Sequence, residues 1–262
     1  MNVAVLGLGE AGSLFAADLA RLGDDVHGYD PAPGSPIEGV LRHDSPEEAV
    51  AGSELVLAVT PGSRAATALS SVVDHLGDGV VYADLSAASP GTKRHLAAVA
   101  AASRVPFVDV ALMSPVPGHG LAAPALAVGS GAGRYAELIN SRGGRVEVLA
   151  GEAGDAVARK LLRSVVLKGL AALLIESTEA ANRYGQAEWF WDHLAHQLGA
   201  IDETLMQRLL EATAYHADRR IDEMNAARDL LTELGVRPTM TEAVIEQLRR
   251  LAAEGMPETG LG

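Results

Sequence analysis

The sequence predicts an α/β domain with a doubly wound parallel sheet, followed by an all-α C-terminal domain. Up to about Ala150, short apolar runs alternate with Ala-rich stretches of helical spacing, and glycines and prolines mark the joints. Beyond Gly154 the strand-like runs cease and long helical stretches follow. Strands that alternate with helices through short connections are typical of a parallel sheet covered by helices. We therefore expect one domain over residues 1–152 and a helical domain over 153–262.

The expected strands of the first domain are short apolar runs bounded by turn residues. These runs are Val3–Leu6, Asp25–Tyr29, Leu55–Val59, Val80–Ala83 and Pro106–Val108. Apolar residues at helical spacing predict helices over Ala11–Leu22, Arg64–Leu76 and Pro90–Ala102. A further helix is expected to begin at Ser45, because serine is a favoured cap, Pro46 suits the first turn and Glu48 stands at the capping-box position.

The second domain is expected to consist of long helices. The predicted helices are Asp155–Tyr184, Glu188–Leu198, Asp202–Leu234 and Thr241–Ala253. The first of them is interrupted by a single glycine, Gly169, and would make about eight turns. Gly235 and Pro238 mark the end of the third helix, because glycine commonly closes a helix and proline cannot continue one.

Composition excludes several classes of function. A net charge of −13 argues against a nucleic-acid partner, which needs a concentrated basic surface. The absence of cysteine excludes disulfides, thiolate metal sites and thiol nucleophiles, and the dispersed histidines predict no metal site. The first residues lack the basic stretch of a signal peptide, and Lys168 breaks the apolar run Val165–Ile175. We expect a soluble cytoplasmic protein that binds neither nucleic acid nor a membrane.

A glycine-rich turn follows the first expected strand and opens the first expected helix. Gly7 would allow a tight turn, Gly9 would let the backbone approach a pyrophosphate, and Gly12 would let helix and strand pack closely. In this context the pattern predicts a Rossmann domain that binds a dinucleotide through Gly7, Leu8, Gly9, Glu10, Ala11 and Gly12. The alternative is a glycine-rich turn without a ligand.

An acidic residue ends the second expected strand. Asp30 stands eighteen residues after Gly12, a spacing that suits acceptance of hydrogen bonds from the adenosine ribose. Its carboxylate would repel a 2′-phosphate and no arginine follows within the next few residues, so the sequence favours NAD over NADP. Thr60, Pro61 and Ser86 follow later strands and are expected to line the same edge of the sheet. Taken singly, Asp30 could be a solvated turn residue and the other turns could be ordinary.

Several motifs together resemble a known family. The segments GLGEAG, VTPG, DLSAASP and DVALMSPVPG, and GEAGDA leading to Lys160, resemble the β-hydroxyacid dehydrogenases, which are related to 6-phosphogluconate dehydrogenase. The helical segments RKLLRSVVLKGLAALLIES and HADRRIDEM resemble a poorly characterised phosphogluconate-dehydrogenase-like branch. The resemblance implies that Lys160 is the catalytic lysine and that residues 109–114 bind substrate. The family's serine falls on Met113, with Ser114 one place later, and its asparagine one turn beyond the lysine is Ser164 here.

The chemistry expected of Lys160 follows from the reaction. Oxidation of an alcohol by hydride transfer needs a group that takes the hydroxyl proton, and reduction needs an acid that returns it. We therefore expect an NAD-dependent dehydrogenase of a small hydroxy acid or a related anionic alcohol; a solvated helix cation is the alternative for Lys160. An imine reductase on the same scaffold is a second reading, against which Lys160 and Asp30 count. A non-catalytic dinucleotide-binding sensor is a third, left open by Ser164.

Three further residues are candidates for binding an anionic substrate. Lys168 lies within about 80° of Lys160 on an ideal helix, although it could instead snorkel at a helix seam. His119 lies on a loop near the substrate segment, where a lone histidine is usually exposed. Arg219 belongs to a face, residues 216–223, that could clamp a carboxylate or form a surface ion-pair ladder.

The helical domain is expected to form a homodimer. Its apolar run Val165–Ile175 and the aromatic cluster 189–191 are large for a set of helices of this size. Apolar surface of this kind is commonly covered by a second copy of the chain.

Overall fold

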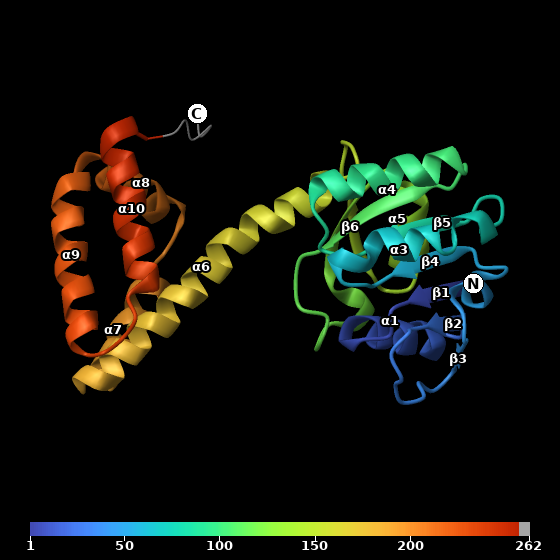
Figure 1. Cartoon of the computed structure of the whole chain (residues 1–262). Helices are drawn as coiled ribbons and strands as arrows, with labels where there is room; N and C mark the ends of the chain where they lie inside the picture. The colour runs from blue at the N-terminus through green and yellow to red at the C-terminus, as the bar shows by residue number, and fades with distance from the viewer. Residues whose placement is uncertain (257–262) are drawn as a thin grey trace. The chain divides into compact units, whose positions relative to one another are not determined.

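The protein, described here by a computed structural model over residues 1–256, divides into two compact units, Met1–Arg163 and a second unit from Ser164 onward. The first unit holds an eight-stranded sheet in the order β3-β2-β1-β4-β5-β6-β7-β8 (Figure 1). Neighbouring strands are parallel except β6 and β7, which are antiparallel. The crossover from β3 back past β1 to β4 is that of a doubly wound sheet. The predicted Rossmann domain followed by a helical region is confirmed.

The first unit alternates strands with helices along the chain. Its elements are β1 (Asn2–Leu6), α1 (Glu10–Arg21), β2 (Asp25–Tyr29), β3 (Val40–Arg42), α2 (Pro46–Val50), β4 (Leu55–Ala58), η1 (Gly62–Arg64), α3 (Ala65–Ser70), η2 (Val73–His75), β5 (Val81–Asp84), α4 (Pro90–Ala102), β6 (Phe107–Leu112), η3 (Gly120–Ala122), β7 (Pro124–Val128), α5 (Ala132–Asn140) and β8 (Arg145–Val148). The capping expected at α2 is present, because the Ser45 hydroxyl accepts from the Glu48 N–H. The first turns of α6 also belong to this unit.

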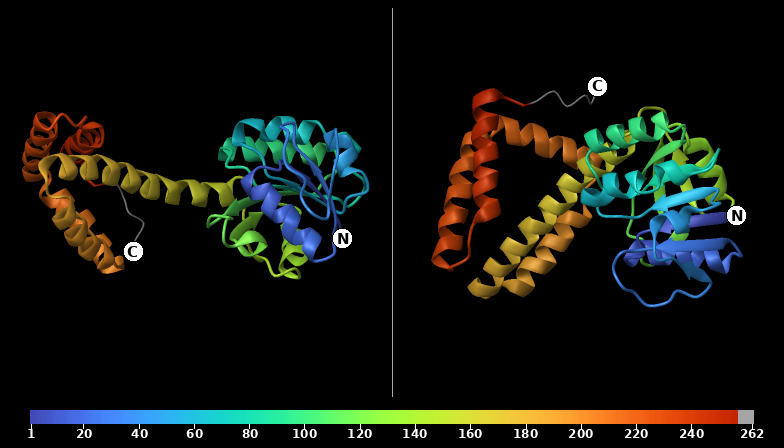
Figure 2. Two further views of the ribbon diagram at one scale, coloured as in Figure 1. Left: turned by 90° about the horizontal axis from the view of Figure 1, so that it is seen from below. Right: turned by 45° about the vertical axis from the view of Figure 1, so that its right-hand side comes forward.

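The second unit is helical. It comprises the rest of α6 (Asp155–Tyr184) and then α7 (Ala187–Gly199), α8 (Glu203–Tyr215), α9 (Ala217–Glu233) and α10 (Thr239–Glu254). Figure 2 shows α9 and α10 side by side. Ala180 of α6, Leu231 of α9 and Val236 of the loop after α9 form a small buried cluster. The buried Glu176 carboxylate accepts hydrogen bonds from the N–H groups of Met240 and Thr241 and so caps α10. Among the described residues, no helix combines the length and apolarity needed to cross a bilayer.

Helices cover both faces of the sheet. On one face α1 and α5 bury Phe15, Leu19 and Ile139 against alternate residues of the strands. On the other face α2, α3 and α4 bury Val50, Leu69 and Leu96, among others, against the remaining strand residues. Strands buried on both faces read as continuous apolar runs, which is why the sequence revealed them.

Two predicted helices are broken, and several elements were not predicted. The stretch expected as Arg64–Leu76 contains α3 between two short 3₁₀ turns, because the hydroxyls of Ser70 and Ser71 bond to carbonyls one turn back and compete with the helix. The helix expected over Asp202–Leu234 is interrupted at His216, which leaves helical geometry with φ −114°. The short elements β3, β7, α5 and β8 were missed.

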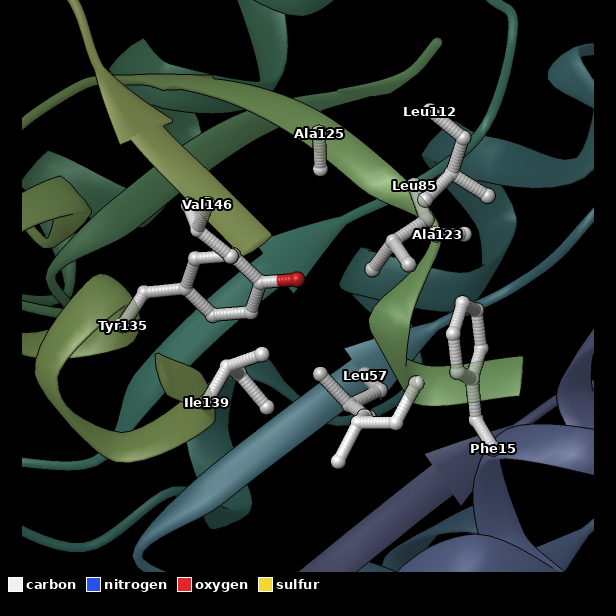
Figure 3. Close-up of a pocket in the computed structure, with 10 residues that line it drawn as sticks. Phe15, Leu57, Leu85, Leu112, Ala123, Ala125, Tyr135, Ile139 and Val146 are labelled. Atoms are coloured by element: carbon white, nitrogen blue, oxygen red, sulfur yellow. The ribbon is translucent and has the colours of Figure 1, made fainter. Parts of the chain in front are cut away.

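A small cavity lies in the core under α5. It measures about 10 Å³, room for about one water, and is lined by apolar side chains that include Leu57, Leu85 and Ile139. Figure 3 shows the hydroxyl of Tyr135 pointing into it. Burial raises the pKa of Tyr135 far above its usual range, so the hydroxyl stays neutral. A cavity this small excludes a substrate, and the functional site must be sought at the edge of the sheet.

One partly buried ion pair connects the loop before β2 to the residues just after α5. The Arg142 guanidinium donates from Nε to Asp24 Oδ2 at 2.6 Å and from Nη2 to Asp24 Oδ1 at 2.7 Å. Burial of Asp24 acts to raise its pKa, but Arg142 and the N-terminal ammonium of Met1 together outweigh this effect and the pKa is lowered. The same bonds raise the pKa of Arg142. This two-bond pair stabilises the fold at the amino edge of the sheet.

Candidate active site

The glycine turn after β1 has no room for a side chain at its first and third glycines, but it has room at the second. Gly7 has φ +95°, and a Cβ there would lie 2.3 Å from the Val59 carbonyl oxygen. A Cβ on Gly12 would lie 1.8 Å from the Gly7 carbonyl oxygen. At Gly9 an added Cβ meets no atom within 4 Å. The turn therefore packs without side chains at two positions and leaves room for a ligand at the third.

The start of α1 offers donors to an anion. Gly9 is the N-cap residue and provides no side-chain cap, so N–H groups of the first turn are left to other acceptors. The helix dipole adds partial positive charge at the same place. An uncapped helix start beside an open glycine is a favourable place for a phosphate group, although Glu10 in the first turn adds one negative charge. These features fit the pyrophosphate of a dinucleotide.

Asp30 lies against the glycine turn. Its Oδ2 accepts from the Leu8 N–H at 2.7 Å and its Oδ1 accepts from the Ala32 N–H at 2.8 Å. The Arg42 guanidinium donates to the carbonyls of Asp30, at 2.9 Å, and of Ala32. Sequence reasoning looked for an arginine only in the few residues after Asp30; pairing of β3 with β2 brings one from twelve positions away. A pocket of about 420 Å³ beside them is lined by Tyr29, Asp30, Arg42 and His43, among others.

The turns after β4 and β5 touch each other. A Cβ on Gly62 would lie 2.9 Å from the Ala88 backbone nitrogen, so the Thr60–Gly62 turn packs directly on the turn that contains Ser86. Within residues 1–256, the Thr60 hydroxyl oxygen is buried and has no hydrogen-bond partner. Ser86 is buried, with its N–H and hydroxyl donating to Asp84 at 2.9 and 3.1 Å. Thr60 thus keeps a hydroxyl that a bound ligand can satisfy.

The start of α6 is bonded to β6. Asp109 Oδ2 accepts from the N–H groups of Gly154, at 2.9 Å, and Val157, at 3.1 Å. Farther along α6, the Arg163 guanidinium donates to the carbonyl of Met113. Lys160 lies between these two attachments and is half-buried. The structure therefore brings the helical stretch that carries Lys160 to the segment that carries Ser114, whose side chain is also half-buried.

The remaining predicted substrate residues belong to other parts of the two units. His119 lines a pocket of about 220 Å³ with Asp18 and Arg21, which lie in the second half of α1, away from the glycine turn. Ser164, half-buried, and Lys168, exposed, belong to the part of α6 in the second unit. Arg219 is exposed near the start of α9, just after the break at His216. Within the first unit, Arg163 joins the stretch of α6 that carries Lys160 to Met113, the residue before Ser114.

Sequence reasoning missed a buried lysine. The Lys93 side chain is 0% exposed, and its Nζ lies 2.7 Å from the Asp84 carbonyl oxygen, 3.3 Å from Asp84 Oδ2 and 3.1 Å from Asp109 Oδ1. We call Lys93, Asp84 and Asp109 the buried ion triad. The sequence does indicate that Lys93 is buried, because it stands three residues before Leu96 and seven before Ala100, on the apolar face of α4.

The fold and the glycine turn define a dinucleotide-binding protein. Residues 2–129 match the NAD-binding domain of 6-phosphogluconate dehydrogenase, and residues 181–251 match a domain of unknown function, DUF1932. A solved protein of unknown function, whose structure was described as similar to 3-hydroxyacid dehydrogenases, is 30% identical, with a TM-score of 0.60, over 98% of this chain and all of that one. The chain belongs to the 3-hydroxyacid dehydrogenase superfamily, as the motifs implied.

Two other similarities bear on the family. A probable 3-hydroxyisobutyrate dehydrogenase of Mycobacterium bovis is 28% identical over 192 residues, which cover 70% of this chain and 65% of that protein. The chain thus matches somewhat less than two thirds of the length of this relative. A reductive aminase from Aspergillus terreus, solved with NADPH4, cyclohexanone and allyl amine, shares the fold with a TM-score of 0.80 at 20% identity and covers 97% of this chain and 94% of that one. At this identity the likeness to the reductive aminase shows a shared fold.

Proposed function

We propose that this protein is an NAD-dependent dehydrogenase of a small hydroxy acid or a related anionic alcohol, with Lys160 as the general acid and base. The observation that carries the proposal is the attachment of the Lys160 stretch of α6 to β6 through Asp109. β6 is parallel to β5, and through β5 and β4 to β1, so its carboxyl end lies at the same edge of the sheet as the glycine turn. Ligands of doubly wound sheets bind outside this edge.

The proposed roles divide between the two sides of the site. When bound, NAD supplies the hydride acceptor. Gly9 and the start of α1 hold its pyrophosphate, Asp30 accepts from the adenosine ribose, and Thr60, Pro61 and Ser86 line the rest of the edge. Lys160, as the neutral amine, takes the hydroxyl proton as the C–H hydrogen leaves as hydride, and the ammonium returns it in the reverse direction. Ser114 binds the substrate by a hydrogen bond.

The substrate class is proposed from the relatives and from charge. The Mycobacterium bovis relative is named for 3-hydroxyisobutyrate, a small hydroxy acid. Lys168, Arg219, Ser164 and His119 remain predictions as further substrate ligands. The experiment is a panel of small hydroxy acids with NAD, monitored by NADH absorbance, beside imines and ketone–amine mixtures with NADPH. Turnover confined to the imine arm would support the imine-reductase reading, and tight NADH binding with no turnover in either arm would support a sensor.

We predict that the enzyme prefers NAD to NADP by about tenfold or more, a difference of about 1.4 kcal/mol. The Asp30 carboxylate stands where an adenosine 2′-phosphate would approach, and like charges repel there. The Asp30→Asn substitution should reduce the preference, because it removes the charge, keeps an acceptor for the Leu8 N–H and leaves Arg42 beside the site. Steady-state kcat/KM with both cofactors is the measurement. A tenfold preference of the unaltered enzyme for NADP would overturn the assignment.

We predict a homodimer formed through the helical region. None of the residues of α7 or α8 is buried in the single chain, although these helices carry large apolar side chains such as Trp189, Trp191 and Met206. Val165, Val166 and Ile175 of α6 are each about 70% exposed. Exposed apolar surface of this extent is typical of an interface. Light scattering at micromolar concentration should give twice the chain mass of 27.1 kDa, and an active species of single mass would contradict the prediction.

A further inference from the structure

We propose that Lys93 is a positioning residue: through the buried ion triad it holds the first turns of α6, and with them Lys160, to the carboxyl ends of β5 and β6. The effect on catalysis rests on the proposed function of Lys160, whereas the connection from Lys93 to α6 does not. Lys93 does not reach the reacting atoms, because its side chain is fully enclosed between α4 and the sheet. Its effect must pass through Asp84 and Asp109.

The triad is costly to bury, and this cost calls for an explanation. Asp84 and Asp109 are register partners on the neighbouring strands β5 and β6, and their side chains are 1% and 0% exposed. Two like charges on adjacent strands destabilise a sheet unless a cation separates them. Apolar residues of similar volume at these three positions would often be neutral or stabilising. Stability alone therefore does not explain the triad.

Each carboxylate of the triad holds a different part of the site. Both oxygens of Asp84 are bonded to Ser86, in a turn that is proposed to line the cofactor edge of the sheet. The two oxygens of Asp109 have different partners. Oδ2 accepts from the N–H groups of Gly154 and Val157 and so caps α6, and Oδ1 lies 3.1 Å from the Lys93 ammonium. The ammonium therefore joins the cofactor turn to the helix that carries the lysine.

The bond from Asp109 to α6 lies close enough to Lys160 along the helix to determine the position of its side chain. Val157, whose N–H binds Asp109, stands three residues before Lys160, which is less than one helical turn. Loss of the Lys93 charge leaves Asp109 buried without its cation, so the carboxylate must take up a proton or move, and either change weakens its hold on the start of α6. A shift of about 1 Å in a catalytic group can lower a rate by about 100-fold. The geometry thus predicts a large effect on turnover with little effect on cofactor affinity.

The test is Lys93→Met, which keeps the length and apolar stem of lysine and removes the charge. Hydrogen–deuterium exchange read by mass spectrometry should become faster in the turn 86–88 and in residues 154–160 together, because both lose their shared anchor. With 3-hydroxyisobutyrate and NAD as the probe reaction, kcat should fall about 10- to 100-fold. The NADH dissociation constant, measured by fluorescence titration, should stay within about threefold, since the glycine turn is untouched.

Arg142→Met is the matched control, because it removes the cation of another, partly buried ion pair of the same unit. Its pair with Asp24 lies at the amino edge of the sheet, opposite the edge that holds the glycine turn, the buried ion triad and the start of α6, although Arg142 lines a pocket with His119. This variant should lower the melting temperature, but it should leave kcat and the exchange of residues 154–160 unchanged. The double variant Lys93→Met with Asp109→Asn removes one charge of each sign. If the single variant does not fold, the double variant should fold and still show faster exchange at 154–160.

The outcomes separate this inference from the proposed function. Unchanged exchange at 154–160 in a folded Lys93 variant would overturn the connection. Faster exchange with unchanged kcat would overturn the positioning role. If the unaltered enzyme turns over no hydroxy acid, the dehydrogenase proposal fails, and the exchange experiment, which needs no substrate, still decides whether Lys93 anchors α6.

Discussion

Replacing Lys160 with methionine is expected to remove turnover and to leave NADH binding nearly intact. A positioned general acid or base contributes typically about 10²- to 10⁴-fold, and we expect kcat to fall by that amount. We propose that the glycine turn and Asp30 hold the cofactor; they follow β1 and β2, which β4 and β5 separate from β6, so its affinity should not change. Methionine keeps the length of the side chain, and an unchanged melting temperature would exclude a folding defect.

The matched control is Lys168→Met, the same substitution eight residues farther along α6. If Lys168 binds an anionic group of the substrate, its loss should raise KM more than it lowers kcat. The comparison therefore distinguishes a proton-transfer role from a charge that only attracts the substrate. A Lys160 variant that keeps more than about a tenth of the turnover would contradict the catalytic role, given the loss expected for such a group. Lys168 or His119 would then become the leading candidate.

The fold was predictable where local signals and burial agree. Strands buried on both faces read as unbroken apolar runs, and β2 and α4 were placed to the residue because turn residues and a Ser89 cap bound them. The helix Asp155–Tyr184 was also placed to the residue. By contrast, β3 has three residues and only pairing with β2 makes it a strand. The helix break at His216 could not be predicted because no glycine or proline stands there.

The site was predictable in its local parts only. A glycine pattern between a strand and a helix can be recognised within a dozen residues, because its steric requirements are local. Arg42 and Lys93 could not be assigned in the same way. Arg42 reaches Asp30 through strand pairing, and Lys93 meets Asp109, sixteen positions away, through the packing of α4 on the sheet. A charged residue on the apolar face of a helix was the available signal, and it indicates a buried partner.

Adding one methyl group to Gly9 should weaken NADH binding without affecting folding, unlike the same change at Gly12. Gly9 has φ −66°, which any residue adopts, and a Cβ there meets no atom within 4 Å. Gly9→Ala should therefore fold with an unchanged melting temperature. In the holoenzyme the methyl group would occupy the space through which a pyrophosphate approaches the backbone. We expect the NADH dissociation constant to rise by about tenfold or more, equivalent to about 1.4 kcal/mol.

Two other glycines supply the controls. Gly133→Ala, on the exposed side of α5 where a Cβ also meets nothing within 4 Å, should leave NADH binding unchanged and stabilise the fold by about 0.4–1 kcal/mol. Gly12→Ala should lower the melting temperature, because its Cβ would stand 1.8 Å from the Gly7 carbonyl oxygen. If Gly9→Ala binds NADH within about twofold of the unaltered protein, the methyl group does not face the cofactor. The dinucleotide would then lie elsewhere along the sheet edge, and the roles proposed for Asp30 and Thr60 would fail with it.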